Sequence, residues 1–129
     1  MIRVYVKKQL NYPVKAASIK RELKNFLKNQ GLVSDFYINV SFVGEKSMKD
    51  IAKRYLGEQN TLHSVLSFSE SEIRGDFKYP ENLPLPLGEI IVCYPEVVRQ
   101  ANKEGKLIDE KVLELVMHGA EHLLGKHHE

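Results

Sequence analysis

Alternation of apolar and polar residues predicts strands in two segments, residues 2–7 and 36–43, because side chains of a strand point to opposite faces in turn. Two further runs, 65–68 and 89–93, are almost continuously apolar and are typical of buried strands. The run 89–93 is the longer of these two, so we expect it at the centre of a sheet. The pattern therefore predicts four strands.

Apolar residues at helical spacing predict a helix over residues 16–29, a second between Ser47 and Gly57, a third over 95–103, and a last helix that starts at Asp109. We expect Ser47 and Asp109 to cap their helices. Residues 69–86, with three prolines, are predicted to be the longest loop. The chain is therefore an α/β protein, a single-domain α+β sandwich spanning 1–129, in which about four to five helices cover a mixed four-stranded sheet.

Composition narrows the class of protein. The chain has 129 residues, 43% of them hydrophobic and 28% charged, as expected for one soluble globular domain. Its single cysteine, Cys93, lies in an apolar run and supports no disulfide framework. We find neither a signal peptide nor a segment long enough to span a membrane, so we expect a cytoplasmic protein with no membrane partner.

Basic residues gather on the helix predicted over 16–29. The formal net charge is only +2, so the molecule as a whole is not a polycation and any nucleic-acid contact needs a local patch. This helix supplies one such face, formed by Lys15, Lys20, Arg21, Lys24 and Lys28. A solvated face is the more common reason for such a pattern, and RNA contact is the less favoured interpretation.

Four of the five histidines fall in the last dozen residues. His118 and His122 are four apart, so a helix places them one turn apart on one face, where two imidazoles can share a metal ion. Gly125 is predicted to end the helix in a left-handed turn that brings His128 back toward the same ion. The pattern HxxxHxxGxxH offers three neutral nitrogen donors and one open position, the layout of a catalytic zinc site.

Other interpretations of these histidines stay open. A histidine at a helix C-terminus is often solvated, because the helix dipole favours imidazolium there. A terminal pair can also be the remnant of an expression tag, although a tag would explain only His127 and His128. His127 competes with His128 as third ligand if the turn is shifted by one residue.

Three segments together resemble the YbeY family, bacterial metal-dependent endoribonucleases linked to ribosomal RNA maturation. They are His118-Gly119-x-x-His122-Leu123-x-Gly125-x-x-His128, the run 65–68 and the run 87–92. The resemblance implies one zinc ion on His118, His122 and His128. It also implies a single-strand-specific endoribonuclease acting in maturation of the 16S ribosomal RNA 3′ end and in ribosome quality control. Its expected partners are RNA and, as further candidates, ribosomal proteins or a GTPase; DNA is not expected.

The surround of the motif departs from the family pattern. The arginine that usually follows the tyrosine of the second helix is Leu56 here, and Arg54 lies two positions away, nearly on the opposite helix face. The family's Asn before that tyrosine is replaced within Ile51-Ala52, and its Thr-Asp before the run 65–68 is His63-Ser64. Within the terminal motif, Glu121 and His127 replace a leucine and an aspartate. The metal ligands match the family, whereas the substrate-handling surround does not.

Cleavage of a phosphodiester needs a Lewis acid, a nucleophile and positive charge near the phosphoryl oxygens. Zinc would supply the first, and the RNA 2′-hydroxyl can serve as nucleophile. Candidates for the positive charge are Lys126, Arg54 and Arg74, which the sequence does not rank. Glu89 is a candidate acceptor for the second ring nitrogen of a ligand histidine, although a plain strand carboxylate is slightly favoured.

Two other functions remain. Metzincin peptidases share the ligand spacing but carry a general-base glutamate directly after the first histidine, a position held here by Gly119. Glu121 gives the inverted HxxEH order and flanks the ligand face, though a solvated glutamate is favoured for it. The third reading is a divergent protein that binds metal and RNA, or a ribosomal partner, with little turnover.

Overall fold

The computed structural model describes residues 1–32, 34–74 and 84–127. Within them the predicted four strands are confirmed and five helices are present. The elements, in chain order, are β1 (Ile2–Lys8), α1 (Ala16–Asn29), β2 (Phe36–Val43), α2 (Glu45–Leu56), β3 (Val65–Ser69), α3 (Glu70–Arg74), β4 (Leu85–Cys93), α4 (Tyr94–Glu104) and α5 (Ile108–His127). None of the helices described in these residues is long and apolar enough to cross a membrane.

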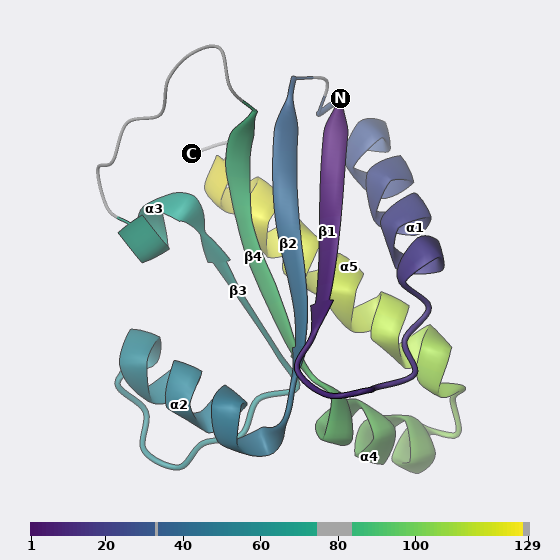
Figure 1. The fold of residues 1–129 in the computed structure, drawn as a ribbon, viewed down its shortest axis with the longest axis vertical. Coiled ribbons are helices and arrows are strands. Elements are labelled where there is room, and N and C mark those ends of the chain that lie inside the picture. The colour runs from purple at the N-terminus through teal and green to yellow at the C-terminus, as the bar shows by residue number, and fades with distance from the viewer. Residues whose placement is uncertain (33, 75–83, 128–129) are drawn as a thin grey trace.

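The sheet is mixed, as predicted, and its strand order is β1-β2-β4-β3 (Figure 1). The strands β1, β2 and β4 run parallel, and β3 pairs antiparallel with β4 at one edge. β4 is therefore an interior strand, flanked by β2 and β3. Its burial on both faces explains the continuous apolar run that marked it in the sequence.

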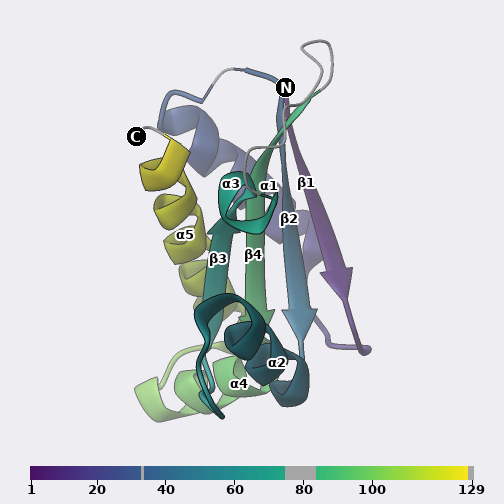
Figure 2. The same cartoon turned by 90° about the vertical axis from the view of Figure 1, so that its left-hand side faces the viewer.

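Helices cover the two faces of the sheet unequally. On one face, α1, α4 and α5 bury the main core against β1, β2 and β4, with Leu23, Ile38, Val40, Ile90 and Val116 fully enclosed. On the other face, a smaller core joins α2 and α3 to β3 and β4 through Met48, Phe68 and Ile91. Figure 2 shows α2 and α3 on the near side of the sheet, in front of β3 and β4. On the same side, β1 and most of β2 carry no helix in the described chain, and α2 packs on the end of β2 at Val43.

Two helix starts differ from the prediction. α2 begins at Glu45, with the extended residue Gly44 as its N-cap, and not at Ser47. Ser47 is therefore the third residue of the helix, and its hydroxyl accepts a hydrogen bond of 2.8 Å from Gln9 Nε2, beyond β1. α5 begins at Ile108, so Asp109 lies in the first turn, where a carboxylate still favours the helix dipole.

The predicted long loop 69–86 is wrong in part, because it contains α3 and the first residues of β4. The backbone N–H of Ser69 donates a 2.9 Å hydrogen bond to Glu72 Oε1, one half of a capping box that starts the short helix α3. Leu85 extends β4 because its N–H donates to the Asp35 carbonyl oxygen at 2.9 Å. Residues 75–83 lie outside the described chain.

Candidate metal centre

Two glycines allow α5 to pack closely against β4 of the sheet, and we call this close packing the seat of α5. A Cβ at Gly119 would lie 2.9 Å from Ile90 Cγ2 on β4, and a Cβ at Gly88 on β4 would lie 2.8 Å from Leu123 Cδ2 on α5. Real side chains essentially never approach so closely, so each glycine makes room for an apolar side chain of the other element. The close seat fixes the rotation of α5 about its axis. The residues on either side of Gly119 are thereby held at the edge of the sheet beside β3.

His118 and His122 lie one turn apart on α5, as predicted, and both are exposed. They line a cleft of about 280 Å³ together with Leu56 at the end of α2, Val65 and Ser67 on β3, and Glu72 on α3. We call this the histidine cleft. The end of α2, the consecutive elements β3 and α3, and α5 therefore meet around the two imidazoles.

Glu72 is a residue of this cleft that the sequence interpretation missed. Its Oε1 lies 3.9 Å from His122 Nε2, and the same oxygen accepts the Ser69 N–H. The carboxylate is therefore held at the start of α3 in a position to orient the His122 ring or to approach a metal ion bound to it. The sequence did carry a signal for it, since Ser69-x-x-Glu72 matches the capping-box pattern.

A second hollow, of about 650 Å³, adjoins the cleft at His118. Glu121 lines this hollow beside His118, so the structure brings together two of the predicted site residues. Ser64 and Glu114 line it as well. Positions 56 and 64, where the chain departs from the family pattern, thus both face the histidines.

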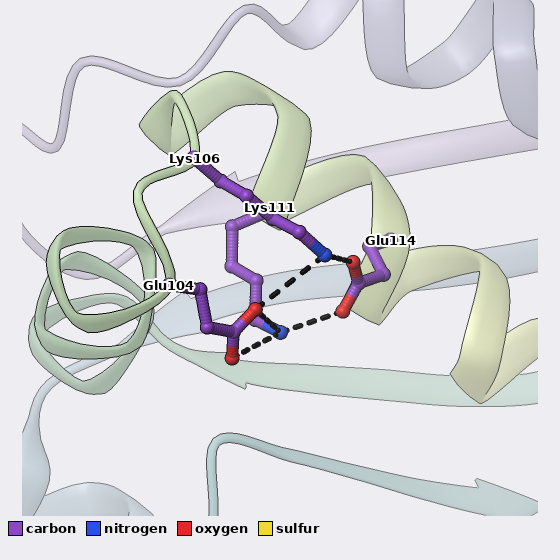
Figure 3. Close-up of polar contacts among 4 residues, drawn as sticks. All are labelled: Glu104, Lys106, Lys111 and Glu114. Atoms are coloured by element: carbon purple, nitrogen blue, oxygen red, sulfur yellow. Dashed lines mark hydrogen bonds and ion pairs between the residues drawn. The ribbon is translucent and has the colours of Figure 1, made fainter.

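A cluster of two lysines and two glutamates, Glu104, Lys106, Lys111 and Glu114, joins the end of α4 to the start of α5 (Figure 3). The buried Lys111 donates hydrogen bonds to Glu104 Oε1 at 3.0 Å and to Glu114 Oε2 at 2.6 Å, and Lys106 donates to Glu114. Hydrogen bonds from Lys106 and Lys111 lower the pKa of Glu114 to about 2 and raise the pKa values of both lysines. Glu114 is thus fixed as an anion one turn before His118.

The predicted turn at Gly125 is wrong. α5 continues through Gly125 to His127, and Gly125 does not adopt a left-handed conformation. Burial of Leu123 and Leu124 keeps this turn of the helix packed on the core, and glycine permits a reversal without requiring one. The reversal expected to return His128 toward the histidine pair therefore does not occur at Gly125. His128 itself lies outside the described residues, as do the side chains of His127, Lys126 and Arg74.

Two other candidates do not join the histidines. Glu89 lies on the opposite face of the sheet from Ile90, the residue that contacts α5, because neighbouring strand residues alternate. The suggestion that Glu89 supports a ligand histidine is therefore wrong. Arg54 is exposed on α2, and among the described residues it does not line the histidine cleft, whereas Leu56 does.

The donor set of the cleft fits zinc, which binds imidazole nitrogen and carboxylate oxygen. His118 and His122 supply two nitrogens on one helix face, and Glu72 supplies an oxygen near the second. In the described part of the chain, these groups do not form a ready cluster of three ligands. A complete site therefore needs either a shift of Glu72 or a donor from the end of the chain.

Comparison with known proteins identifies the family. A family model described as Endoribonuclease YbeY matches residues 5–129. The Endoribonuclease YbeY of Thermodesulfovibrio yellowstonii is 34% identical over 134 residues, covering 99% of this chain and 78% of its own. The Endoribonuclease YbeY of Azoarcus sp. is 33% identical over 129 residues. That match covers 100% of this chain but only 50% of the Azoarcus protein.

A solved structure gives the same answer for the fold. The solution structure of a Thermotoga maritima protein superposes with a TM-score of 0.56 at 26% sequence identity, covering 95% of this chain and 71% of that one. The overall fold of this chain is thus similar to that of the Thermotoga maritima protein. Together, these matches show that the chain belongs to the Endoribonuclease YbeY family, whose name denotes hydrolases acting on RNA.

Proposed function

We propose that the chain is a zinc-dependent endoribonuclease that cleaves single-stranded RNA in the histidine cleft. The observation that carries the proposal is the pair His118 and His122, exposed on one face of α5 in a cleft with Glu72 at 3.9 Å from His122. Membership of the Endoribonuclease YbeY family supports RNA as the substrate. The motif HxxxHxxGxxH supports His128 as the third ligand.

The roles of the residues follow from their places. His118 and His122, with a third donor, would hold the zinc ion, which when bound polarises a phosphoryl oxygen and lowers the pKa of its water. Glu121, beside His118, is placed to accept a proton from the attacking hydroxyl or water. Glu72 orients the His122 ring through their contact. Lys126 remains the candidate for positive charge near the phosphate.

We further propose, on family membership, that the RNA is ribosomal. The activity would then belong to maturation of the 16S ribosomal RNA 3′ end and to ribosome quality control in the cytoplasm, with ribosomal proteins or a GTPase as candidate partners. This chain spans half of the Azoarcus relative, so the activity of that whole protein comes to it only as part of this proposal.

A peptidase is the less favoured candidate. The general base of a metzincin would stand at position 119, where any side chain meets Ile90 Cγ2 at 2.9 Å. The fold thus leaves no room for that carboxylate. Glu121 is the observation that keeps metal-assisted hydrolysis of another substrate open, since it lines the hollow beside His118.

Weak turnover is the third candidate, and Leu56 is the observation that favours it. The family arginine position lies in the histidine cleft, and an apolar leucine stands there. A cleft without that guanidinium has less positive charge to stabilise a pentacoordinate phosphate.

The test is cleavage of fluorescent single-stranded and duplex RNA by the chain, by His118→Ala and by His63→Ala. His63 is the matched control, because its Nε2 contacts Glu58 Oε1 at 2.6 Å and it does not line the histidine cleft. We expect His118→Ala to lose at least about 100-fold in activity, because it removes a zinc ligand. We expect His63→Ala to retain activity. Equal loss in both variants, or equal cleavage by both, would contradict the proposal.

A further inference from the structure

One face of the sheet is only partly covered, and in the described chain no helix lies over β1 and most of β2 on that face. Its residues on β1 and β2 are paired in register as Arg3 with Tyr37, Tyr5 with Asn39 and Lys7 with Ser41. We call these six residues the open sheet face. They point away from the main core, because their neighbours Val4, Ile38 and Val40 point into it. Figure 2 looks onto this side, with β1 and most of β2 uncovered.

An aromatic pair lies on the open sheet face. The rings of Tyr5 and Tyr37 are diagonal neighbours on adjacent strands, with centroids 6.1 Å apart and planes at 65°. Tyr5 is 45% exposed. Isolated exposed apolar residues are ordinary, but two adjacent aromatic rings on a bare sheet form a surface on which flat groups can stack. Sheets that bind single-stranded RNA stack its bases on aromatic side chains in this way.

Cations frame the aromatic pair. Arg3 lies at one end of the open sheet face and Lys7 at the other, both exposed, and Lys8 follows Lys7 at the end of β1. Lys7 and Lys8 form no ion pair with any residue that the structure describes. Arg3 lowers the pKa of the Asp35 carboxyl, though less than the contact with the Met1 amino group does. Positive charge on both sides of stacking rings matches a strand of bases joined by phosphates.

A pocket of about 390 Å³ closes the lower end of the face, where Lys7, Lys8, Ser41 and Glu89 meet Ile51 of α2. Glu89 repels phosphate at this point but can accept hydrogen bonds from base amino groups. Phosphates are therefore favoured along β1, and base edges along β2 and β4. This division of charge points to a nucleic-acid strand rather than to an acidic protein.

We propose that the open sheet face is a second RNA-binding surface, which stacks bases of single-stranded RNA on Tyr5 and Tyr37 and pairs phosphates with Arg3 and Lys7. It is distinct from the histidine cleft, which lies at the opposite edge of the sheet beside β3. Three strand spacings, about 14 Å in the plane of the sheet, separate β1 from β3, and α2 and α3 pack over β3 and β4 on the side of the open sheet face. The proposal rests on the proposed function only for the identity of the ligand as RNA.

The first test measures binding of a short fluorescent single-stranded RNA by anisotropy in the His118→Ala background, where cleavage does not consume the probe. Tyr5→Ala with Tyr37→Ala is expected to weaken binding at least about tenfold, and the matched Tyr5→Phe with Tyr37→Phe to bind like the parent. Arg3→Gln with Lys7→Gln should make the dependence of log K on log salt less steep by about 1.4, about 0.7 for each phosphate contact with a single strand. Lys53→Gln with Lys103→Gln, two exposed lysines of α2 and α4 that lie off the open sheet face, is the charge control and should bind like the parent.

The outcomes separate the two proposals. If the parent binds RNA and the alanine variant binds equally well, the open sheet face is not an RNA surface, while the proposed function stands. If the His118→Ala parent binds no RNA, the open sheet face is not an RNA surface, and cleavage by the unmutated chain decides the proposed function separately. If the alanine variant changes the oligomeric state by light scattering and leaves RNA affinity unchanged, the face is an interface between copies and this inference is overturned. Thermal unfolding of each variant confirms that it is folded.

Discussion

The polar residues of α5 are ion-paired near the start of the helix and face open clefts further along it. At the start, Lys111 is buried, its side chain only 6% exposed, and its charge is met by Glu104 and Glu114 (Figure 3). Toward the other end, His118, Glu121 and His122 are exposed along two hollows. One end of the helix has its charges neutralised within the protein, and the other presents donors to a cleft.

Charged residues that stabilise the fold can therefore be distinguished, on one helix, from residues that bind a metal or act in catalysis. A charge that has partners on neighbouring elements fixes the helix in place, and its removal is expected to change stability. A donor that faces a cleft contributes little to stability, and its removal is expected to change metal binding and catalysis. The cluster and the histidines thus predict opposite outcomes in the same pair of assays.

The largest stability effect is expected at Lys111. Lys111→Ala leaves Glu104 and Glu114 close together with only Lys106 between them, so we expect the free energy of unfolding to fall by about 2–3 kcal/mol. Urea unfolding measures it, with Lys103→Ala on the exposed face of α4 as control, expected within about 0.5 kcal/mol of the parent. Zinc content should not change in either variant. A loss of zinc from the folded Lys111→Ala protein would contradict the separation of α5 into a stabilising, ion-paired start and a metal-binding end.

The next effect concerns the seat of α5. Gly119→Ala gains up to about 1 kcal/mol in helix propensity but places a methyl group 2.9 Å from Ile90 Cγ2. Overpacking of this kind costs about 1–3 kcal/mol, so a net loss of about 1–2 kcal/mol is expected in thermal or urea unfolding.

Gly125→Ala is the matched control, because it is an exposed helical glycine with open space around a Cβ, and it should gain up to about 1 kcal/mol. Combining Gly119→Ala with Ile90→Ala should cost less than the sum of the two single losses, since Ile90→Ala removes the atoms that the new methyl group meets. Additive losses in the double variant would show that the close contact does not determine the seat.

The sequence predicted most of the fold for an identifiable reason. Strand alternation and helical periodicity record which side is buried, so β1, β2, α1 and the interior strand β4 follow directly from it. The ends of elements depend on contacts that periodicity does not record. Ser47 is not the cap because the helix already starts at Glu45, after Gly44, whose N–H donates to Gln9 Oε1 from a distant part of the chain.

The site was predictable only where spacing along one helix decides it. His118, Glu121 and His122 share α5, and the structure groups them as expected. Glu72 comes from another element and could be placed only once α3 and β3 were folded beside α5. Glu89 was considered because of its position at the start of a strand, but the face to which it points follows from the bulge in pairing between β2 and β4.

A smaller effect is expected on catalysis at Leu56. Leu56→Arg introduces a guanidinium into the histidine cleft, where it can stabilise phosphoryl charge, so we expect RNA cleavage to rise up to about tenfold. Single-turnover cleavage measures it, with Leu107→Arg, an exposed leucine outside the cleft, as control. Unchanged cleavage would mean that position 56 is not used for charge stabilisation in this chain.

The smallest effect concerns pH. The pKa of Glu114 is lowered from 4.5 to about 2, so its contribution to stability is fully present above about pH 4.5 and is lost as the pH falls toward 2. Glu114→Gln removes this titration, so its stability should fall less steeply than that of the parent over that window. The side chain is 45% exposed and solvent screens the pairs, so the difference in slope is small. Parallel acid profiles would contradict the assignment of Glu114 as the fixed anion of the cluster.

The most direct test of the account is the zinc content of the purified, untagged chain, measured by elemental analysis beside His118→Ala and His63→Ala. We expect about one zinc ion per chain in the parent and in His63→Ala. We expect the His118→Ala protein to be folded but to have lost its zinc. Zinc retained by His118→Ala, or absent from the parent after incubation with zinc, would contradict the assignment of the exposed end of α5 as the metal centre.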